Sequence, residues 1–173
     1  MRLEPLRDEH RDALWAIAQD ERIWAFMRLS AHESRERFDE WWSTVELGFA
    51  HYFDGELVGH TSFLNHRPDD RSIEIGHTWV VPAAFGSGAN VGAKYLLLRH
   101  LFESEGMFRV EFKTDALNDR SRRALAALPA TFEGVMRKHM LVRGGQRRDS
   151  AWYSVIDDEW PVVKAQLERR LNR

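Results

Sequence analysis

The chain has 173 residues, of which 43% are hydrophobic and 30% charged, and its formal net charge is −2. This length and composition predict one folded domain over residues 1–173 rather than a disordered chain. The nearly balanced charge argues against binding to nucleic acid or to a membrane. Because cysteine is absent, disulfides, thiolate catalysis and zinc sites with cysteine ligands are excluded.

Targeting and metal-binding signals are also missing from the sequence. The first residues are not typical of a signal peptide, and no apolar run approaches the roughly 20 residues of a membrane span. We therefore expect a cytoplasmic protein. The eight histidines include no H-x-x-x-H pair, so no metal site is expected.

The first predicted elements are a short edge strand at residues 2–6 and a helix over residues 8–20. A second helix is predicted from residue 33 to residue 47. Strands at 50–53 and 56–65 then form a hairpin around Asp54-Gly55.

A long strand is predicted at residues 72–81, followed by a glycine-bearing loop and a helix from Asn90 to about Ser104. The second half of the chain continues the mixed pattern. Its predicted elements are a strand at 108–114, a helix at 118–128, strands at 131–141 and 149–156 joined by Gly144-Gly145, and a closing helix at 160–171.

The loop before the helix at Asn90 is the most informative part of the sequence. A helix start leaves backbone N–H groups unpaired, and the peptide dipoles add positive charge there. Gly86 and Gly88 let an anion approach these groups closely, which predicts binding of a phosphate or pyrophosphate. The alternative is a tight turn with Asn90 as its helix cap. A dinucleotide fingerprint is excluded because the third glycine is Gly92, one position late, and a Walker loop lacks its Gly-Lys-Ser/Thr.

The ordered set of elements and motifs resembles the GNAT superfamily of acetyl-CoA-dependent N-acetyltransferases. Within it, the chain looks most like the RimJ/RimL-type N-terminal acetyltransferases of ribosomal proteins. The resemblance covers nearly the whole chain and rests on these segments: EIGHTW at 74–79, FGSGAN at 85–90, AKYLLL at 93–98, NDRS at 118–121, FEG at 132–134, and the tail from 148 to 160.

The resemblance implies an α/β (α+β) fold with a mixed, mostly antiparallel sheet of about seven strands and helices on both faces. It implies one acetyltransferase domain over residues 1–173 that moves an acetyl group from acetyl-CoA to a primary amine, without a metal. It also implies the residues that bind acetyl-CoA: Trp79, Val80 and Val81 at the pantetheine arm and carbonyl, the loop residues Phe85, Gly86, Ser87, Gly88, Ala89 and Asn90, and Lys94, Asn118 and Ser121.

The sequence departs from the family pattern at four positions. Phe85 replaces a polar loop residue, and Asn90 replaces a small one. Leu125 stands where many relatives place a tyrosine as general acid, and Pro129 stands where a glycine usually follows the helix. These departures leave open a catalytically weak acyl-CoA-binding protein.

The residues that move protons are less sharply predicted. Ser121 is the first candidate for protonating the departing thiolate, and Tyr153 is the second. Glu74, Glu133 and His139 are the candidates for the base, and no spacing selects one of them.

A chain without an obvious strong base is better suited to α-amines, with pKa near 8, than to lysine amines near 10.4. We therefore expect a peptide or protein N-terminus as the acceptor, with a small-molecule amine as the alternative. Arg143, Arg147 and Arg148 either guide an acidic partner or lie exposed in a hairpin. The Trp41-Trp42 pair leaves a homodimer open.

Overall fold

The computed structural model describes residues 1–172, and within them seven strands form one sheet in the order β1-β2-β3-β4-β5-β7-β6. Neighbouring strands are antiparallel except β4 and β5, which are parallel. The predicted fold class, a mixed and mostly antiparallel sheet with helices, is confirmed. The strands are β1 (Arg2–Pro5), β2 (Leu47–Phe53), β3 (Glu56–Arg67), β4 (Ser72–Val80), β5 (Arg109–Asp115), β6 (Thr131–Val142) and β7 (Gln146–Ile156).

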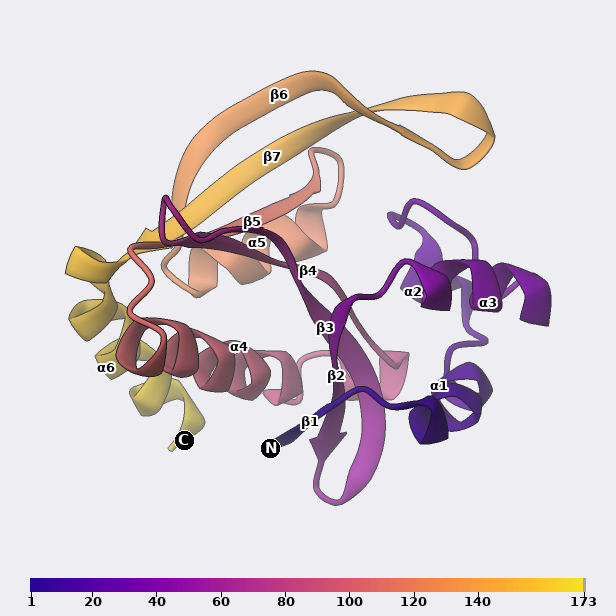
Figure 1. Ribbon diagram of the computed structural model, residues 1–173, viewed down its shortest axis with the longest axis horizontal. Coiled ribbons are helices and arrows are strands. Elements are labelled where there is room, and N and C mark those ends of the chain that lie inside the picture. Colours follow the sequence, from indigo (N-terminus) through magenta and orange to yellow (C-terminus); the bar gives the residue numbers. More distant parts are fainter. Residues whose placement is uncertain (173) are drawn as a thin grey trace.

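The helices lie in two groups on either side of the sheet (Figure 1). The first group covers one face and consists of α4 (Ala89–Arg99), α5 (Asp119–Ala127) and α6 (Trp160–Leu171), with α4 packed against α6. The second group lies beside β3 and consists of α1 (Arg11–Ile17), α2 (Glu21–Trp24) and α3 (Arg35–Ser43). Each group of helices packs over its own hydrophobic core.

The core beneath α4 and α6 is mostly aliphatic. Alternate residues of β4 and β5, such as Ile75 and Val110, point to this face and meet Leu98 of α4 and Leu167 of α6, all of them buried. Each such side chain stabilises the fold by about 1.5 to 3 kcal/mol. The glutamate and lysine residues that alternate with them therefore face the other side of the sheet.

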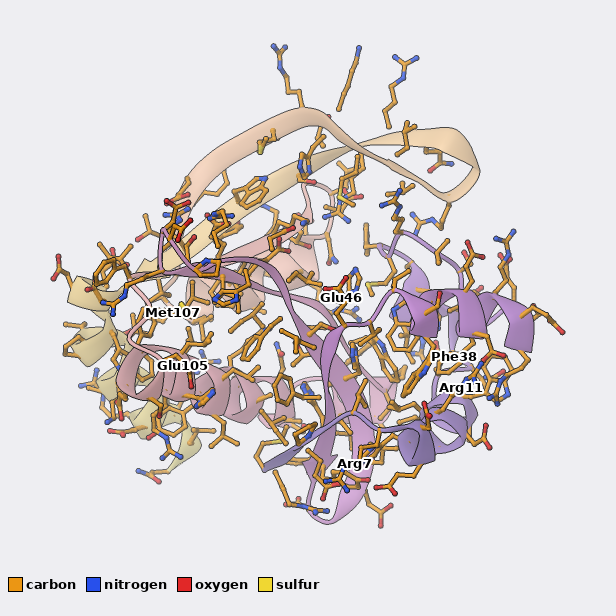
Figure 2. The ribbon with its side chains drawn as sticks, in the orientation of Figure 1. Arg7, Arg11, Phe38, Glu46, Glu105 and Met107 are labelled. Atoms are coloured by element: carbon orange, nitrogen blue, oxygen red, sulfur yellow. The ribbon has the colours of Figure 1, made fainter. Side chains whose placement is uncertain are left out.

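The core between α1, α2 and α3 is aromatic. Trp24, Trp41 and Trp79 have their ring centroids 5.4 to 6.0 Å apart. Phe38, labelled in Figure 2, is fully buried between Trp15 of α1 and Trp41. Because Trp79 lies near the end of β4, this core fixes that end of the strand.

Several boundaries differ from the sequence predictions. The helix predicted at 33–47 is only α3, because Ser34 caps its start and β2 already begins at Leu47. The short helix α2 was not predicted at all. α4 begins at Ala89, one residue earlier than predicted, and a π-helical turn (His100–Ser104) continues it.

The far end of the long β6–β7 hairpin extends beyond the other strands of the sheet and reaches the turn after α2 (Figure 1). At its tip, Nη1 of Arg143 donates to the carbonyl oxygens of Trp24 (2.8 Å) and Met27 (3.0 Å). Arg148 donates to the carbonyl oxygen of Phe26 at 3.3 Å. Two of the three arginines predicted either to guide an acidic partner or to lie exposed thus form hydrogen bonds within the protein.

Candidate active site

The site begins where β4 and β5 stop pairing. Their parallel ladder joins only Ser72–Glu74 to Arg109–Glu111. Just beyond it, β4 carries a β-bulge in which His77 and Thr78 lie opposite a single residue of β3, Thr61. The bulge changes which face the following side chains point to, so that Trp79 joins the aromatic core while Ile75 stays beneath α4.

The end of β4 presents its free backbone groups on the side away from β3. The N–H of Val81 donates to the carbonyl oxygen of Val58 (2.8 Å), and its own carbonyl accepts from Ala84 (2.9 Å). Because strand residues alternate in the direction of their hydrogen bonds, the N–H and C=O of Val80 point toward the side that β5 has left. Of the three predicted residues at this position, Val80 is therefore placed best to pair with an extended ligand.

The glycine loop leads directly into α4. Gly86 (φ +76°) and Gly88 (φ +93°) adopt backbone conformations that favour glycine, and a Cβ at either would meet open space. Among the described residues, the N–H groups of Gly86, Gly88 and Asn90 have no partner, whereas that of Ala89 donates to the Ser87 hydroxyl at 3.2 Å. These amides and the helix dipole fit a pyrophosphate.

The departures at Phe85 and Asn90 can now be located. Gly88, not Asn90, is the helix cap, and Oδ1 of Asn90 is buried without a partner, so a bound ligand has a polar group to pair with there. The ring of Phe85 carries the guanidinium of Arg120 at 4.0 Å from its centroid. A positive charge from α5 therefore lies beside the loop where the usual polar side chain is missing.

Asn118 and Ser121 lie at the start of α5, on the far side of the same opening. Asn118 caps the helix, because its Oδ1 accepts from the N–H of Ser121 at 3.1 Å. Asn118 also lines a pocket of about 340 Å³ between α2 and α5, together with Phe26 and Arg22. The predicted capping role of Asn118 is thus present, and its predicted contact with pantetheine stays a prediction.

Glu74 lies on the face of the sheet opposite α4, at the last residue before the two strands part. Its side chain is 1% exposed. Oε2 accepts from Nζ of Lys113 (2.8 Å) on β5 and from Nδ2 of Asn65 (2.7 Å) on β3. This carboxylate is therefore buried but paired, as a buried charge must be. Asn65 and Lys113 were not predicted as site residues. The period-two pattern of β5 places Lys113 on this face, whereas Asn65 reaches it through the irregularity of β3 after Leu64, where the φ of Asn65 is +49°.

The other two candidate bases are held by other groups. His139 lies against the ring of Trp152 and shares a hydrogen bond with the Ser150 hydroxyl at 3.0 Å. Its pKa is lowered, first by desolvation and then by the charges of Lys113 and Arg148. Glu133 forms a two-pronged ion pair with Arg109, whose hydrogen bonds lower the carboxyl pKa and make it a weaker base.

Tyr153, the second candidate acid, is buried on the face of the sheet that α4 and α6 cover. Its hydroxyl accepts from Nε of Arg122 at 3.3 Å, and its ring packs against Phe132. Leu125, at the position of the family tyrosine, is part of the same core. The structure therefore separates Tyr153 from Glu74 and His139, which both lie on the face of the sheet opposite α4.

Lys94 was predicted as a residue that binds acetyl-CoA; that role stays a prediction. It lies in α4, is 6% exposed, and its Nζ donates to Oγ1 of Thr78 at 2.9 Å. Nζ is also 5.4 Å from the ring centroid of Phe112 on β5. Desolvation lowers the pKa of Lys94 from 10.5 to about 7, although the negative charge of Glu74 opposes this.

Two further properties concern the described residues as a whole. In residues 1–172, no three His, Asp or Glu side chains are grouped so that they could hold a metal ion. No helix in the same range is long and apolar enough to cross a membrane.

Comparison with known proteins agrees with this geometry. Residues 1–130 match the family model of the acetyltransferase (GNAT) domain. No curated protein matches the chain. One solved structure, described as an acetyltransferase, is 40% identical, with a TM-score of 0.92 over 98% of this chain and 90% of its own.

A GCN5-related N-acetyltransferase from Brucella melitensis is 31% identical, with a TM-score of 0.89 over 97% of this chain and 80% of its own. RimJ of Mycobacterium smegmatis, solved with CoA-disulfide, is 24% identical with a TM-score of 0.82 and covers 97% and 88%, which shows a shared fold. The family match and these identities together establish that the chain belongs to the GNAT family of acetyl-CoA-dependent N-acetyltransferases.

Proposed function

We propose that this N-acetyltransferase acts on the α-amine of a peptide or protein N-terminus, as the RimJ/RimL type does. The carrying observation is the set of hydrogen-bond donors around Glu74. Among the described residues, Nε1 of Trp152 and Nε of Arg148 are buried without a hydrogen-bond partner. Trp152 lies over Lys113, with Nζ 5.5 Å from its ring centroid, and Lys113 in turn contacts Glu74.

Unpaired buried donors favour a ligand that brings acceptors. The carbonyl groups of a peptide are such acceptors, whereas the ammonium and amine groups of a polyamine supply mainly donors and positive charge. The donor set therefore supports a peptide over a polyamine.

Glu74 is the base that this proposal uses. An acceptor amine that displaces Lys113 from Oε2 would reach the carboxylate beside the point where the strands part. Its nitrogen would then attack the thioester carbonyl, while Glu74 takes the proton that the nitrogen loses. A carboxylate is a weak base, so an α-amine that is already partly neutral at pH 7 is a better acceptor than a lysine amine.

At the other end of the reaction, unpaired backbone groups hold acetyl-CoA. The amides of Gly86, Gly88 and Asn90 would bind its pyrophosphate, with Arg120 adding a positive charge, and the backbone of Val80 would pair with its pantetheine arm. Asn118 would bind that arm from α5. Ser121 and Tyr153 stay predictions for the acid.

The test is release of CoA with three acceptors: a lysine-free peptide with a free α-amine, the same peptide with its α-amine acetylated and one lysine added, and spermidine. We expect kcat/KM for the free α-amine to exceed that for the lysine by roughly 200-fold, the ratio of their neutral fractions at pH 7. Faster acetylation of the lysine peptide or of spermidine would overturn the proposal.

The variant Trp152→Phe tests the donor argument separately, because it keeps the ring and removes the N–H. We expect KM for the peptide to rise about 2- to 10-fold, the value of one hydrogen bond, with KM for acetyl-CoA unchanged. Benzylamine, which has no carbonyl group, is the matched acceptor, and its KM should not change. An equal effect on both acceptors would show that Trp152 does not bind the peptide.

A further inference from the structure

Neither the sequence nor the family pattern identifies which residue acts as the acid of the reaction. When the C–S bond of the thioester breaks, the sulfur takes the electron pair and must gain a proton. Leu125 has no proton to give, and the Tyr153 hydroxyl is buried in the hydrophobic core, where it accepts a hydrogen bond from Arg122. A serine hydroxyl such as that of Ser121 is a very weak acid and needs a further group to supply its proton.

Lys94 places an ionisable group where the two strands diverge. Thr78 lies on β4 beyond the last paired residue, and Phe112 directly follows the last paired residue of β5. Nζ of Lys94 is 2.9 Å from the first and 5.4 Å from the ring centroid of the second. The amine therefore reaches from α4 to the opening between the strands, on the opposite side of the sheet from Glu74.

The burial of Lys94 has no structural explanation. An ammonium group carries three donors, and here Thr78 is its one hydrogen-bond partner among the described residues. Thr78 does not depend on it, because its hydroxyl also shares a hydrogen bond with Thr61 at 2.6 Å. A buried lysine without a paired carboxylate destabilises a fold relative to an apolar side chain, so its presence points to a function.

We propose that Lys94 is the proton donor to the CoA thiolate in this acetyl transfer. As the C–S bond breaks, the Lys94 ammonium gives one proton to the sulfur and becomes a neutral amine. The acceptor nitrogen loses one proton to Glu74 as the new C–N bond forms. The two protons balance, and each group returns to its starting state by exchanging one proton with solvent: Glu74 releases one and Lys94 takes one up. This proposal rests on the acetyl transfer itself, not on the identity of the acceptor.

The charges around Lys94 agree with such a role. Glu74 on β4 is the charged group that acts on Lys94, and the two histidines that the Lys94 charge itself reaches are His51 on β2 and His60 on β3. Burial lowers the pKa of His60 to about 3 and that of His51 well below its usual value, so both are neutral. Glu74 is thus the charge that favours the ammonium, while desolvation brings the Lys94 pKa to about 7. Both forms of the amine are accessible at neutral pH.

Three substitutions separate proton donation from other roles. Lys94→Met removes the proton and the charge. Lys94→Arg keeps the charge but cannot release a proton, because guanidinium stays protonated in proteins. Lys94→Gln keeps a hydrogen-bond donor for Thr78. We expect all three to lower kcat at least 100-fold, with the Kd for acetyl-CoA within a few-fold of wild type. Lys164→Met, on the exposed side of α6, is the matched control and should keep full activity.

Two outcomes would overturn the proposal. If Lys94→Arg retains activity, the charge alone is sufficient, and if Lys94→Gln retains it, the contact with Thr78 is sufficient. The wild-type enzyme gives a test that needs no variant: its kcat should fall as pH rises above about 7, and a kcat that is flat from pH 7 to 9 contradicts proton donation by Lys94. A wild-type protein that acetylates no acceptor at all would instead refute the proposed function.

Discussion

The buried lysine has a consequence for stability that can be measured without any substrate. The pKa of Lys94 is lowered to about 7 in the folded protein, whereas in the unfolded chain it is expected to return to 10.5. Between these two pH values the unfolded state binds one more proton than the native state. The free energy of unfolding must therefore rise with pH across this window, by about 1.4 kcal/mol per pH unit at most.

The variant Lys94→Met lacks this dependence. Its unbranched side chain fits the same buried space, and Thr78 keeps its hydrogen bond to Thr61. At pH 7.5 we expect the variant to be more stable than the wild type. As pH rises to 9.5, the wild type should gain about 2.5 kcal/mol relative to the variant, because the cost of releasing the lysine proton on folding falls as pH approaches the unfolded pKa. A substitution that removes catalysis and adds stability is typical of a functional residue.

The assay is urea unfolding followed by tryptophan fluorescence at pH 7.5, 8.5 and 9.5, for wild type and variant side by side. Most other titrating groups are common to both proteins and cancel in the difference. A difference in unfolding free energy that stays constant over these pH values would show that Lys94 titrates normally in the folded state. The reasoning about its burial would then be wrong.

Three further predictions follow from the site. Glu74→Gln should lower kcat/KM by 10²- to 10⁴-fold with acetyl-CoA binding intact by calorimetry, whereas Glu133→Gln should change kcat/KM by less than about 3-fold; the opposite ranking would exchange the two roles. Gly59→Ala puts a Cβ against the Trp79 carbonyl oxygen, so β4 must shift. We expect the free energy of unfolding to fall by about 1 to 3 kcal/mol and acetyl-CoA to bind more weakly. Unchanged acetyl-CoA binding would show that the end of β4 does not hold the ligand. Arg143→Ala removes two hydrogen bonds that hold the hairpin tip, and it should raise KM for a peptide acceptor without changing KM for acetyl-CoA. If the variant and the wild type have the same KM for the peptide, the hairpin tip does not contribute to acceptor binding.

Local patterns in the sequence were sufficient for the glycine loop and for most of the elements. Gly86, Gly88 and the helix after them are adjacent in the chain, so the geometry of an anion-binding helix start follows from short-range sequence alone. The period-two strands also placed Glu74 and Lys113 correctly within their strands. The errors at residues 33–47 and 21–24 arose where tryptophan packing, rather than local propensity, decides how far a helix extends.

The chemistry between the strands was decided only by the tertiary structure. Lys94 contacts Thr78 on one side of the sheet and Glu74 contacts Lys113 on the other, and no spacing in the sequence shows either contact. These contacts depend on the register of β4 with β5, which ends at Glu74, and on the bulge at His77-Thr78. Register and bulges are set by long-range pairing and core packing. The sequence by itself thus determined the family, the sheet and the glycine loop before α4, and the folded chain determined which buried ionisable groups lie where the β4–β5 ladder ends.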